Sequence, residues 1–252
     1  MTERELKQDS VDNWNKEDGV LTGYECPICN NKGYIFCLDD DGNEHAKACE
    51  CMRVRRARAL ALNSGLGATL KLYTFQRYMH DEPWQDYIYN KAIKFVEDRE
   101  AHCFYIGGQS GSGKTHICTA IVREFIKQYK DVQYVVWNDV VTALKQDIVD
   151  NVENYNSTID RLKKATVLFI DDFFKTAPTA ADLDKAFQII NYRYNISRVE
   201  SEKRYITIIS SERLLNELTE IDAAIAGRIA ELSNNTYIIG VQGGTNKDMR
   251  RK

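Results

Sequence analysis

The chain has 252 residues, of which 43% are hydrophobic and 28% are charged, with only 3 prolines. This composition excludes a disordered tail and a Pro-rich or collagen-like chain, and the length predicts one main domain with a small appendage. The net charge of −3 excludes a protein held to nucleic acid by bulk positive charge. No hydrophobic run approaches the ~20 residues of a membrane span, and the polar N-terminus lacks a signal-peptide core, so we expect a cytoplasmic protein with no membrane partner.

The N-terminal part of the chain is short and rich in cysteine. Residues 1–23 form a polar lead that we expect to be helical or flexible, and residues 24–51 hold five of the seven cysteines. Because thiols stay reduced in the cytosol, this cluster predicts a metal site and not a disulfide framework. Two strand-like segments, Tyr34–Leu38 and Glu44–Ala48, flank the turn dipeptide Asp41-Gly42 and predict a two-stranded ribbon.

The cysteines of this segment form two close pairs, Cys26 with Cys29 and Cys49 with Cys51. Four thiolates suit one tetrahedral Zn²⁺, and so short a segment has too little core to fold without such a staple. The tight second pair leaves Cys37 and His45 open as substitutes for one ligand, and redox or unliganded cysteines are the alternative to zinc. Cys103 and Cys118 lie in hydrophobic patterns, so we expect them in the core.

Residues 52–66 predict a basic linker helix that ends at Asn63-Ser64-Gly65. Its arginines are Arg53, Arg55, Arg56 and Arg58. They could contact the phosphates of a nucleic acid, the acidic groups of a partner, or solvent alone, which is the usual environment of a run of charges.

Residues 67–252 alternate between strand-like and helical patterns. The expected strands are Cys103–Gly107, Val132–Trp137, Val167–Ile170, Tyr205–Ile209 and Tyr237–Val241. Between them, hydrophobic residues recur at helical spacing, as from Ile117 to Ile126 and from Leu183 to Tyr194. This alternation predicts an α/β fold with a parallel sheet covered by helices on both faces.

A phosphate-binding loop follows the first of these strands and opens a helix. Its residues are Gly108, Gln109, Ser110, Gly111, Ser112, Gly113, Lys114 and Thr115, which match the pattern G-x-x-x-x-G-K-[ST]. The glycines let backbone N–H groups surround a phosphate, and the helix N-terminus adds partial positive charge. Lys114 is predicted to reach the β- and γ-phosphates of ATP, and the Thr115 hydroxyl is predicted to ligate Mg²⁺.

Two carboxylates, Asp171 and Asp172, stand at the end of the hydrophobic strand Val167–Ile170. In an open α/β sheet this end faces the nucleotide, so Asp171 is predicted to hold Mg²⁺ and Asp172 to orient or deprotonate the attacking water. Paired acids alone often only cap a helix, but the preceding phosphate loop favours the catalytic interpretation. The next residues, Phe173 to Lys175, could stack on single-stranded DNA, although such an aromatic pair is more typical of a core.

This combination resembles the DnaC/DnaI-type replicative helicase loaders, particularly the phage-type replication ATPases of the AAA+ superfamily. The resemblance covers about residues 24–251 and rests on the cysteine pairs, the ribbon, the Arg-rich helix, Phe75, the phosphate loop through His116, and Asp171 to Lys175. It implies an AAA+ core preceded by a helicase-binding N-terminal domain. It also implies ATP, Mg²⁺, single-stranded DNA, the hexameric replicative helicase, and self-association into a ring or spiral on that helicase.

The same resemblance implies further site residues. The segment that ends in Ser211 and Glu212 matches sensor 1, with Ser211 as a nucleotide contact and Glu212 where many AAA+ proteins have Asn. The segment around Arg228 matches the one that carries the arginine finger, so Arg228 is the candidate that reaches a neighbour's ATP; a solvated helix arginine is the alternative. Asp172 stands where many AAA+ enzymes have Glu, and its shorter side chain predicts slow hydrolysis that assembly or DNA stimulates.

The sequence thus predicts an ATPase that loads a replicative helicase on single-stranded DNA and grips that helicase through its zinc module. One alternative is a transposition-helper ATPase of the IstB type, against which the cysteine ribbon argues. A second alternative is an adaptor that binds ATP without hydrolysing it, which phosphate-release kinetics with DNA and helicase present would distinguish.

Overall fold

The computed structural model describes residues 2–61, 65–199, 204–244 and 247–249. The chain divides into two compact units, Met1–Ala59 and Leu60–Lys252. Among the described residues, none of the helices combines the length and the hydrophobicity that crossing a membrane requires.

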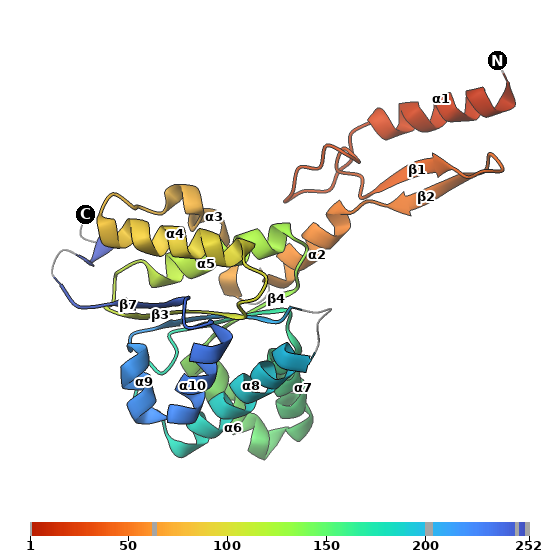
Figure 1. Ribbon diagram of the computed structural model, residues 1–252. Helices are drawn as coiled ribbons and strands as arrows, with labels where there is room; N and C mark the ends of the chain where they lie inside the picture. Colours follow the sequence, from red (N-terminus) through yellow and green to blue (C-terminus); the bar gives the residue numbers. More distant parts are fainter. Residues whose placement is uncertain (1, 62–64, 200–203, 245–246, 250–252) are drawn as a thin grey trace. The chain divides into compact units, whose positions relative to one another are not determined.

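The first unit contains α1 (Glu3–Lys16), the strands β1 (Tyr34–Leu38) and β2 (Glu44–Ala48), and the start of α2 (Cys51–Ala61) (Figure 1). The two strands pair antiparallel from Tyr34 opposite Ala48 to Leu38 opposite Glu44, which confirms the predicted ribbon and its limits. Gly42, in the turn, has a φ of 80°, a conformation that glycine adopts without strain.

The N-terminal helix packs on this ribbon and is part of the same unit. The Trp14 ring lies 5.0 Å from the Tyr34 ring and meets the Phe36 ring edge-on at 4.7 Å. The Asn15 side chain donates to the Phe36 carbonyl and accepts from the Phe36 N–H, both at 3.0 Å, so it satisfies the outer edge of β1. Within the predicted polar lead, the helix Glu3–Lys16 is therefore a layer of the small unit, because its Trp14 ring and its Asn15 amide both contact β1.

Two arginines of the basic helix α2 donate hydrogen bonds to other residues of the first unit. Arg55 donates to the carbonyl oxygens of Thr22 and Tyr24, at 2.6 and 2.7 Å, and Arg58 donates to the Gly23 carbonyl. Arg53 and Arg56 are exposed, as expected for a solvated face. The helix is described to Ala61, and Asn63 and Ser64 of its expected end lie outside the described residues.

The second unit is an α/β fold with a five-stranded sheet in the order β4-β5-β6-β3-β7. Its elements are α3 (Gly67–Leu72), the short 3₁₀ helix η2 (Phe75–Arg77), α4 (Pro83–Glu97), β3 (Cys103–Gly108), α5 (Lys114–Lys127), β4 (Val132–Val136), α6 (Trp137–Asp150), α7 (Val152–Lys164), β5 (Val167–Asp171), α8 (Ala180–Val199), β6 (Ile206–Ser211), α9 (Leu215–Ile221), α10 (Ala223–Leu232) and β7 (Ile238–Val241). All four strand pairs are parallel, so the five strands confirm the predicted fold class.

Helices cover both faces of this sheet: α4 and α5 lie on one side, and α8, α9 and α10 lie on the other (Figure 1). Every residue of β3, β5 and β6 is buried, which explains their continuous hydrophobic sequences. Strand β6 lies between β3 and β5. The phosphate loop after β3 and the acids after β5 are therefore separated by the end of β6.

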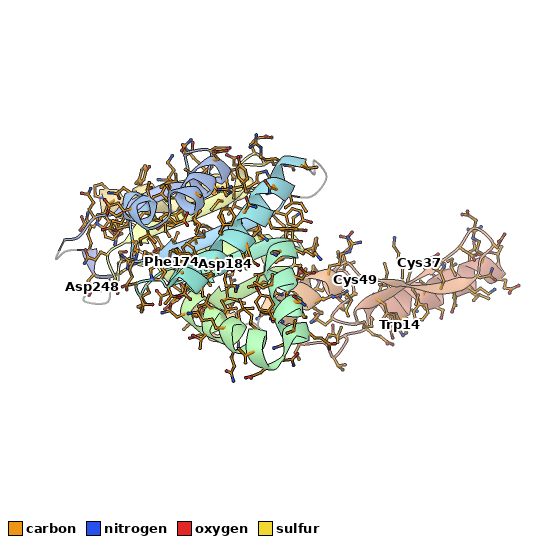
Figure 2. All side chains as sticks on the ribbon, turned by 90° about the horizontal axis from the view of Figure 1, so that it is seen from below. Trp14, Cys37, Cys49, Phe174, Asp184 and Asp248 are labelled. Atoms are coloured by element: carbon orange, nitrogen blue, oxygen red, sulfur yellow. The ribbon has the colours of Figure 1, made fainter. Side chains whose placement is uncertain are left out.

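Two expectations about single residues concern this core. Cys103 and Cys118 are fully buried, as predicted. Phe173 and Phe174 are buried too: their rings stack at 4.1 Å, and both meet Trp137 edge-on. Stacking of these two rings on DNA bases is thus excluded, because both faces of the pair are committed to the core; Figure 2 shows Phe174 within the second unit.

Candidate nucleotide and metal sites

The phosphate loop lies between β3 and α5, as the sequence predicts. At Gly107 any side chain would overlap the Arg213 carbonyl, and Gly108 combines a φ of 116° with close contact to Val241. These two glycines let the base of the loop lie directly against neighbouring backbone. The loop then enters α5 at Lys114, whose preceding Gly113 has a φ of 80°.

Lys114 is buried and held inside its own loop. Its ammonium group donates to the carbonyl oxygens of Gly108, at 2.8 Å, and Gln109, at 2.7 Å. Burial lowers the pKa of Lys114, and the nearby carboxylates oppose that shift, Glu212 more strongly than Asp172. The ammonium group is therefore within electrostatic range of both carboxylates.

Asp171 accepts hydrogen bonds from hydroxyl groups on three other elements. Thr115 donates to its Oδ1 at 3.1 Å, Ser210 donates to the same oxygen, and Tyr134 donates to Oδ2 at 3.2 Å. Burial raises the pKa of Asp171, the Asp172 charge adds to the rise, and the three hydroxyls oppose it. The site thus offers a carboxylate and a threonine hydroxyl side by side. Mg²⁺ prefers oxygen ligands of this kind, so the donor set fits that ion.

A cavity of about 520 Å³ lies in front of the phosphate loop. Its lining residues are Tyr73, Arg77, Met79, Ser110, Gly111, Gly113, Lys114, Thr115, His116, Asp172, Lys175, Glu212 and Met249. Of the predicted site residues, Ser110, Gly111, Gly113, Lys114, Thr115 and Asp172 line this cavity, whereas Gly108, Gln109, Ser112 and Asp171 do not. Asp171 is connected to the cavity through the hydrogen bond that it accepts from Thr115.

Ser211 departs from its expected place as a nucleotide contact. Its side chain is buried, donates to the Phe173 carbonyl at 2.7 Å and accepts from the Arg213 N–H at 3.0 Å. Both hydrogen bonds go to backbone groups, and the Ser211 backbone pairs with Gly107 inside the sheet. Its role is to hold the turn that follows β6.

The acid after Asp171 carries an ion pair. Asp172 has a φ of 54°, unusual for a residue other than glycine, and its carboxylate lies 2.9 Å from the Lys175 ammonium. Glu212 faces the same cavity, and across the described part of the chain its side chain has neither a hydrogen bond nor an ion pair. Two carboxylates therefore face the cavity, one paired and one unpaired.

Sequence reasoning missed several residues of this cavity. Tyr73 stacks on His116 at 4.7 Å, although the two are 43 positions apart, and the Met249 N–H donates to the Gly111 carbonyl at 2.9 Å. Tyr73 and Met249 come from outside the motifs, so no spacing rule would have found them, whereas His116 directly follows the phosphate-loop motif. Lys175 was noted only as a DNA contact, yet its position three residues after Asp172 was a usable signal.

Arg228, the arginine-finger candidate, is half-buried on α10. Its guanidinium donates to Asn191 Oδ1 at 2.8 Å and to the Ala224 carbonyl at 2.9 Å, and it lies 4.7 Å from the Phe187 ring. It does not line the cavity of its own chain. To reach the ATP of a neighbouring subunit, the Arg228 guanidinium would have to leave Asn191.

The four paired cysteines meet in the first unit. The sulfur atoms of Cys26, Cys29, Cys49 and Cys51 all lie within 4.8 Å of one another, and all four residues are buried. The Cys26–Cys49 and Cys29–Cys51 distances between Sγ atoms are 3.7 and 3.5 Å. Tetrahedral Zn–S bonds of about 2.3 Å place sulfur atoms about 3.8 Å apart, so the cluster has the dimensions of a Zn²⁺ site.

The remaining candidate ligands stand apart from this cluster. Cys37 pairs with His45 across the ribbon, and neither belongs to the metal-ligand group found among the described residues. Figure 2 shows Cys49 at the end of the ribbon near α2 and Cys37 farther along it. Burial opposes ionisation of Cys29, but the Gly33 N–H and the neighbouring thiols bring its pKa down to about 7. Burial raises the pKa of Cys49 and Cys51 in the same cluster, so a bound metal would have to deprotonate these two thiols.

Comparison with known proteins agrees with this geometry. The sequence profile of the IstB-like ATP binding protein family matches residues 48–221. The chain belongs to this family. The IstB-like chain is 29% identical over 225 residues to the uncharacterized protein YqaM of Bacillus subtilis, covering 82% of this chain and 68% of YqaM. It is 20% identical over 178 residues to the replicative helicase loader DnaC of Escherichia coli, covering 70% of each protein.

The fold of the IstB-like chain is found in solved structures. The crystal structure of DnaI matches with a TM-score of 0.54 and 22% identity, covering 69% of this chain and 92% of DnaI. This likeness establishes the fold: the five-stranded parallel sheet is that of the AAA+ cores. The predicted fold class and the resemblance to DnaC/DnaI-type proteins are thereby confirmed.

Proposed function

We propose that this protein is an ATP-dependent loader that binds a replicative helicase and places it on single-stranded DNA. The observation that carries the proposal is a cavity lined by phosphate-loop residues, among them Lys114 and Thr115, with Asp171 hydrogen-bonded to Thr115, in a chain whose first unit brings four cysteines together. Likeness to the replicative helicase loader DnaC supports the choice of partner.

In this account the second unit binds and hydrolyses ATP. The backbone N–H groups of the loop and the start of α5 surround the phosphates, while Lys114 exchanges its two loop carbonyls for phosphate oxygens. Thr115 and Asp171 would hold Mg²⁺, which when bound neutralises charge on the β- and γ-phosphates. The attacking water requires a carboxylate, and among the described residues Asp172 and Glu212 are the two carboxylates that line the cavity.

The first unit is proposed to bind Zn²⁺ through its four buried cysteines and to grip the helicase. Zinc at this site would lock the ribbon, α1 and the start of α2 into one rigid module. Arg53 and Arg56 remain exposed on α2 and are available to a partner's acidic groups. Hydrolysis by the second unit would be slow in isolation and stimulated by DNA or by assembly on the helicase, with Arg228 reaching a neighbour's ATP.

The direct test is retention of the cognate replicative helicase on the immobilised full-length protein, with ATP, with ADP and without nucleotide. We expect retention in all three conditions through the zinc module, with ATP changing the amount of protein bound per helicase hexamer. Absence of helicase binding, with zinc and ATP both bound, would refute the loader function.

The family match also favours a second candidate, a transposition-helper ATPase. Such a protein would act on a DNA-bound transposase and would not need the cysteine module to recognise a helicase. Cooperative binding of ATP and double-stranded DNA by the protein, without binding of the helicase, would favour this candidate. An adaptor that binds ATP without turnover would show helicase binding with no phosphate release.

A further inference from the structure

The turn after β6 lies between the two halves of the nucleotide site. Strand β6 runs between β3, which leads into the phosphate loop, and β5, which ends in Asp171. Ser211, its last residue, pairs with Gly107 at the base of the loop. Glu212 is the next residue, so it leaves the sheet between the phosphate loop and the magnesium-binding acid.

The backbone on both sides of Glu212 is fixed. Ser211 is anchored to Phe173 and to the Arg213 N–H by its hydroxyl. The Arg213 guanidinium donates to the Phe174 carbonyl at 2.8 Å, and the Arg213 carbonyl accepts from the Tyr105 hydroxyl at 2.7 Å. That same carbonyl packs against Gly107, which tolerates no side chain there. The position of Glu212 relative to the loop is therefore set before nucleotide binds.

The two carboxylates that face the cavity differ in what they can do. The Asp172 carboxylate is held in a 2.9 Å ion pair with Lys175. Glu212 has no such bond to lose within the described residues, and its charge acts on Lys114 more strongly than that of Asp172. A general base must have a free lone pair directed at the water it deprotonates. The Glu212 side chain faces the cavity with no partner among the described residues, whereas the Asp172 carboxylate shares its Oδ2 with the Lys175 ammonium group.

We propose that Glu212 is the catalytic carboxylate that orients the attacking water and takes its proton. This inference rests on the proposed ATPase function. The water oxygen forms a bond to the γ-phosphorus, the bond from the γ-phosphorus to the bridging oxygen of ADP breaks, and the water proton passes to a Glu212 carboxylate oxygen. The proton then leaves to solvent or to the released phosphate, which restores the carboxylate. Asp172 and Lys175 keep their ion pair and form the opposite wall.

Four variants of the full-length protein test this assignment: Glu212→Gln, Glu212→Asp, Asp172→Asn and, as a matched control, Glu220→Gln on the exposed surface of α9. Nucleotide affinity is measured with ATP and Mg²⁺, and phosphate release is measured with single-stranded DNA and helicase present. The nucleotide bound after several minutes is identified by chromatography.

We expect Glu212→Gln to bind ATP within about threefold of wild type and to lose on the order of 100-fold or more in kcat, the usual contribution of a general base. Its bound nucleotide should remain ATP. Glu212→Asp should keep an intermediate rate, Asp172→Asn should lose less than Glu212→Gln, and Glu220→Gln should match wild type.

Two results would overturn the proposal. One is a Glu212→Gln protein that hydrolyses ATP within about threefold of wild type, while Lys114→Ala is inactive; the ATPase function would then stand without this role. The other is a larger loss in Asp172→Asn than in Glu212→Gln, which would return the role to Asp172. If wild type itself showed no phosphate release above the Lys114→Ala background, the proposed ATPase function and this inference would both fail.

Discussion

The Thr115 hydroxyl donates a 3.1 Å hydrogen bond to the Asp171 carboxylate, although the two residues are 56 positions apart. This bond joins the first turn of α5 to the end of β5, across the end of β6. A threonine hydroxyl and a carboxylate in contact form an oxygen pair into which Mg²⁺ can insert. Nucleotide binding is therefore expected to replace a bond that already aligns the two ligands.

Asp171→Asn should stabilise the protein without nucleotide and abolish its stabilisation by Mg²⁺ and ATP. Burial raises the pKa of Asp171 above its unfolded value of about 3.9. The stability that this shift contributes is present below about pH 4 and is lost as the pH rises through the native pKa. At neutral pH the buried negative charge of Asp171 therefore destabilises the folded state, and the uncharged Asn removes this destabilisation.

Thermal unfolding of wild type and Asp171→Asn, with chelator at about pH 5 and about pH 8, measures this effect. An increase of about 1 kcal/mol in the free energy of unfolding would raise the Tm of Asp171→Asn by about 2–4 °C. We expect this increase in Tm to be larger at the higher pH. A variant that is less stable than wild type at both pH values would show that the three hydroxyl bonds to the carboxylate outweigh its burial.

Lys114→Ala should abolish ATP binding while the fold persists. Loss of a buried, charge-assisted contact to phosphate is expected to weaken affinity on the order of 100-fold or more. Lys127→Ala, at the exposed end of the same helix, is the matched control and should bind ATP normally. Titration with a fluorescent ATP analogue compares them, and nanomolar-to-micromolar binding shared equally by both variants would contradict the role of Lys114.

The sequence predicted those parts of the site that lie within one continuous motif. The phosphate loop and Asp171 were predictable because strand, loop and helix follow one another, so local spacing determines their geometry. Tyr134 and Ser210 were not, since their contact with Asp171 depends on β4 and β6 flanking β5, and strand order is not encoded in any local pattern. The sensor 1 match pointed to Glu212, but the motif does not reveal that the Glu212 side chain is unpaired. That follows from the fold, in which Lys175 forms its ion pair with Asp172.

The small unit shows the same division between local and distant information. The cysteine spacing and the Asp41-Gly42 turn predicted the ribbon to the residue. The packing of α1 was missed because it rests on Trp14 and Asn15, two polar-helix residues whose partners lie about 20 positions later. Arg55 was expected at a surface and instead binds three groups of its own unit, which only the folded loop at residues 22–31 brings together.

Zinc removal should unfold the first unit and leave the ATPase unit intact. Structural zinc sites contribute about 10–16 kcal/mol of folding free energy, far more than so small a unit can replace. We expect one Zn²⁺ per chain, its loss in a Cys49→Ser, Cys51→Ser double variant, and unchanged ATP affinity in that protein. Metal analysis by mass spectrometry provides the measurement.

Cys37→Ser is the matched control for the zinc experiment, because Cys37 lies on the ribbon outside the cluster. It should retain one Zn²⁺ per chain. Full zinc content in the double variant, together with its loss in Cys37→Ser, would move the ligand set to Cys37 and His45. Wild-type protein that contains no zinc after purification without chelator would refute the metal site.

Arg228→Ala should leave ATP binding by the isolated protein unchanged and suppress hydrolysis in the assembled state. Arginine fingers contribute about 10³–10⁵ in rate. Mixing Lys114→Ala with Arg228→Ala should restore part of the activity, because one subunit supplies the phosphate loop and the other the arginine. If the two variants assemble together on the helicase and stay inactive, the Asn191 contact is the whole role of Arg228.

The most direct test of the loader function is helicase loading on a circular single-stranded DNA that carries an annealed oligonucleotide, measured by release of that oligonucleotide. A closed circle has no end for a hexamer to thread, so release reports loading. We predict rapid release with helicase, ATP and the wild-type protein, and release near background with Lys114→Ala or with the Cys49→Ser, Cys51→Ser protein. Equal release without this protein, or with the Lys114→Ala protein, would contradict an ATP-dependent loader.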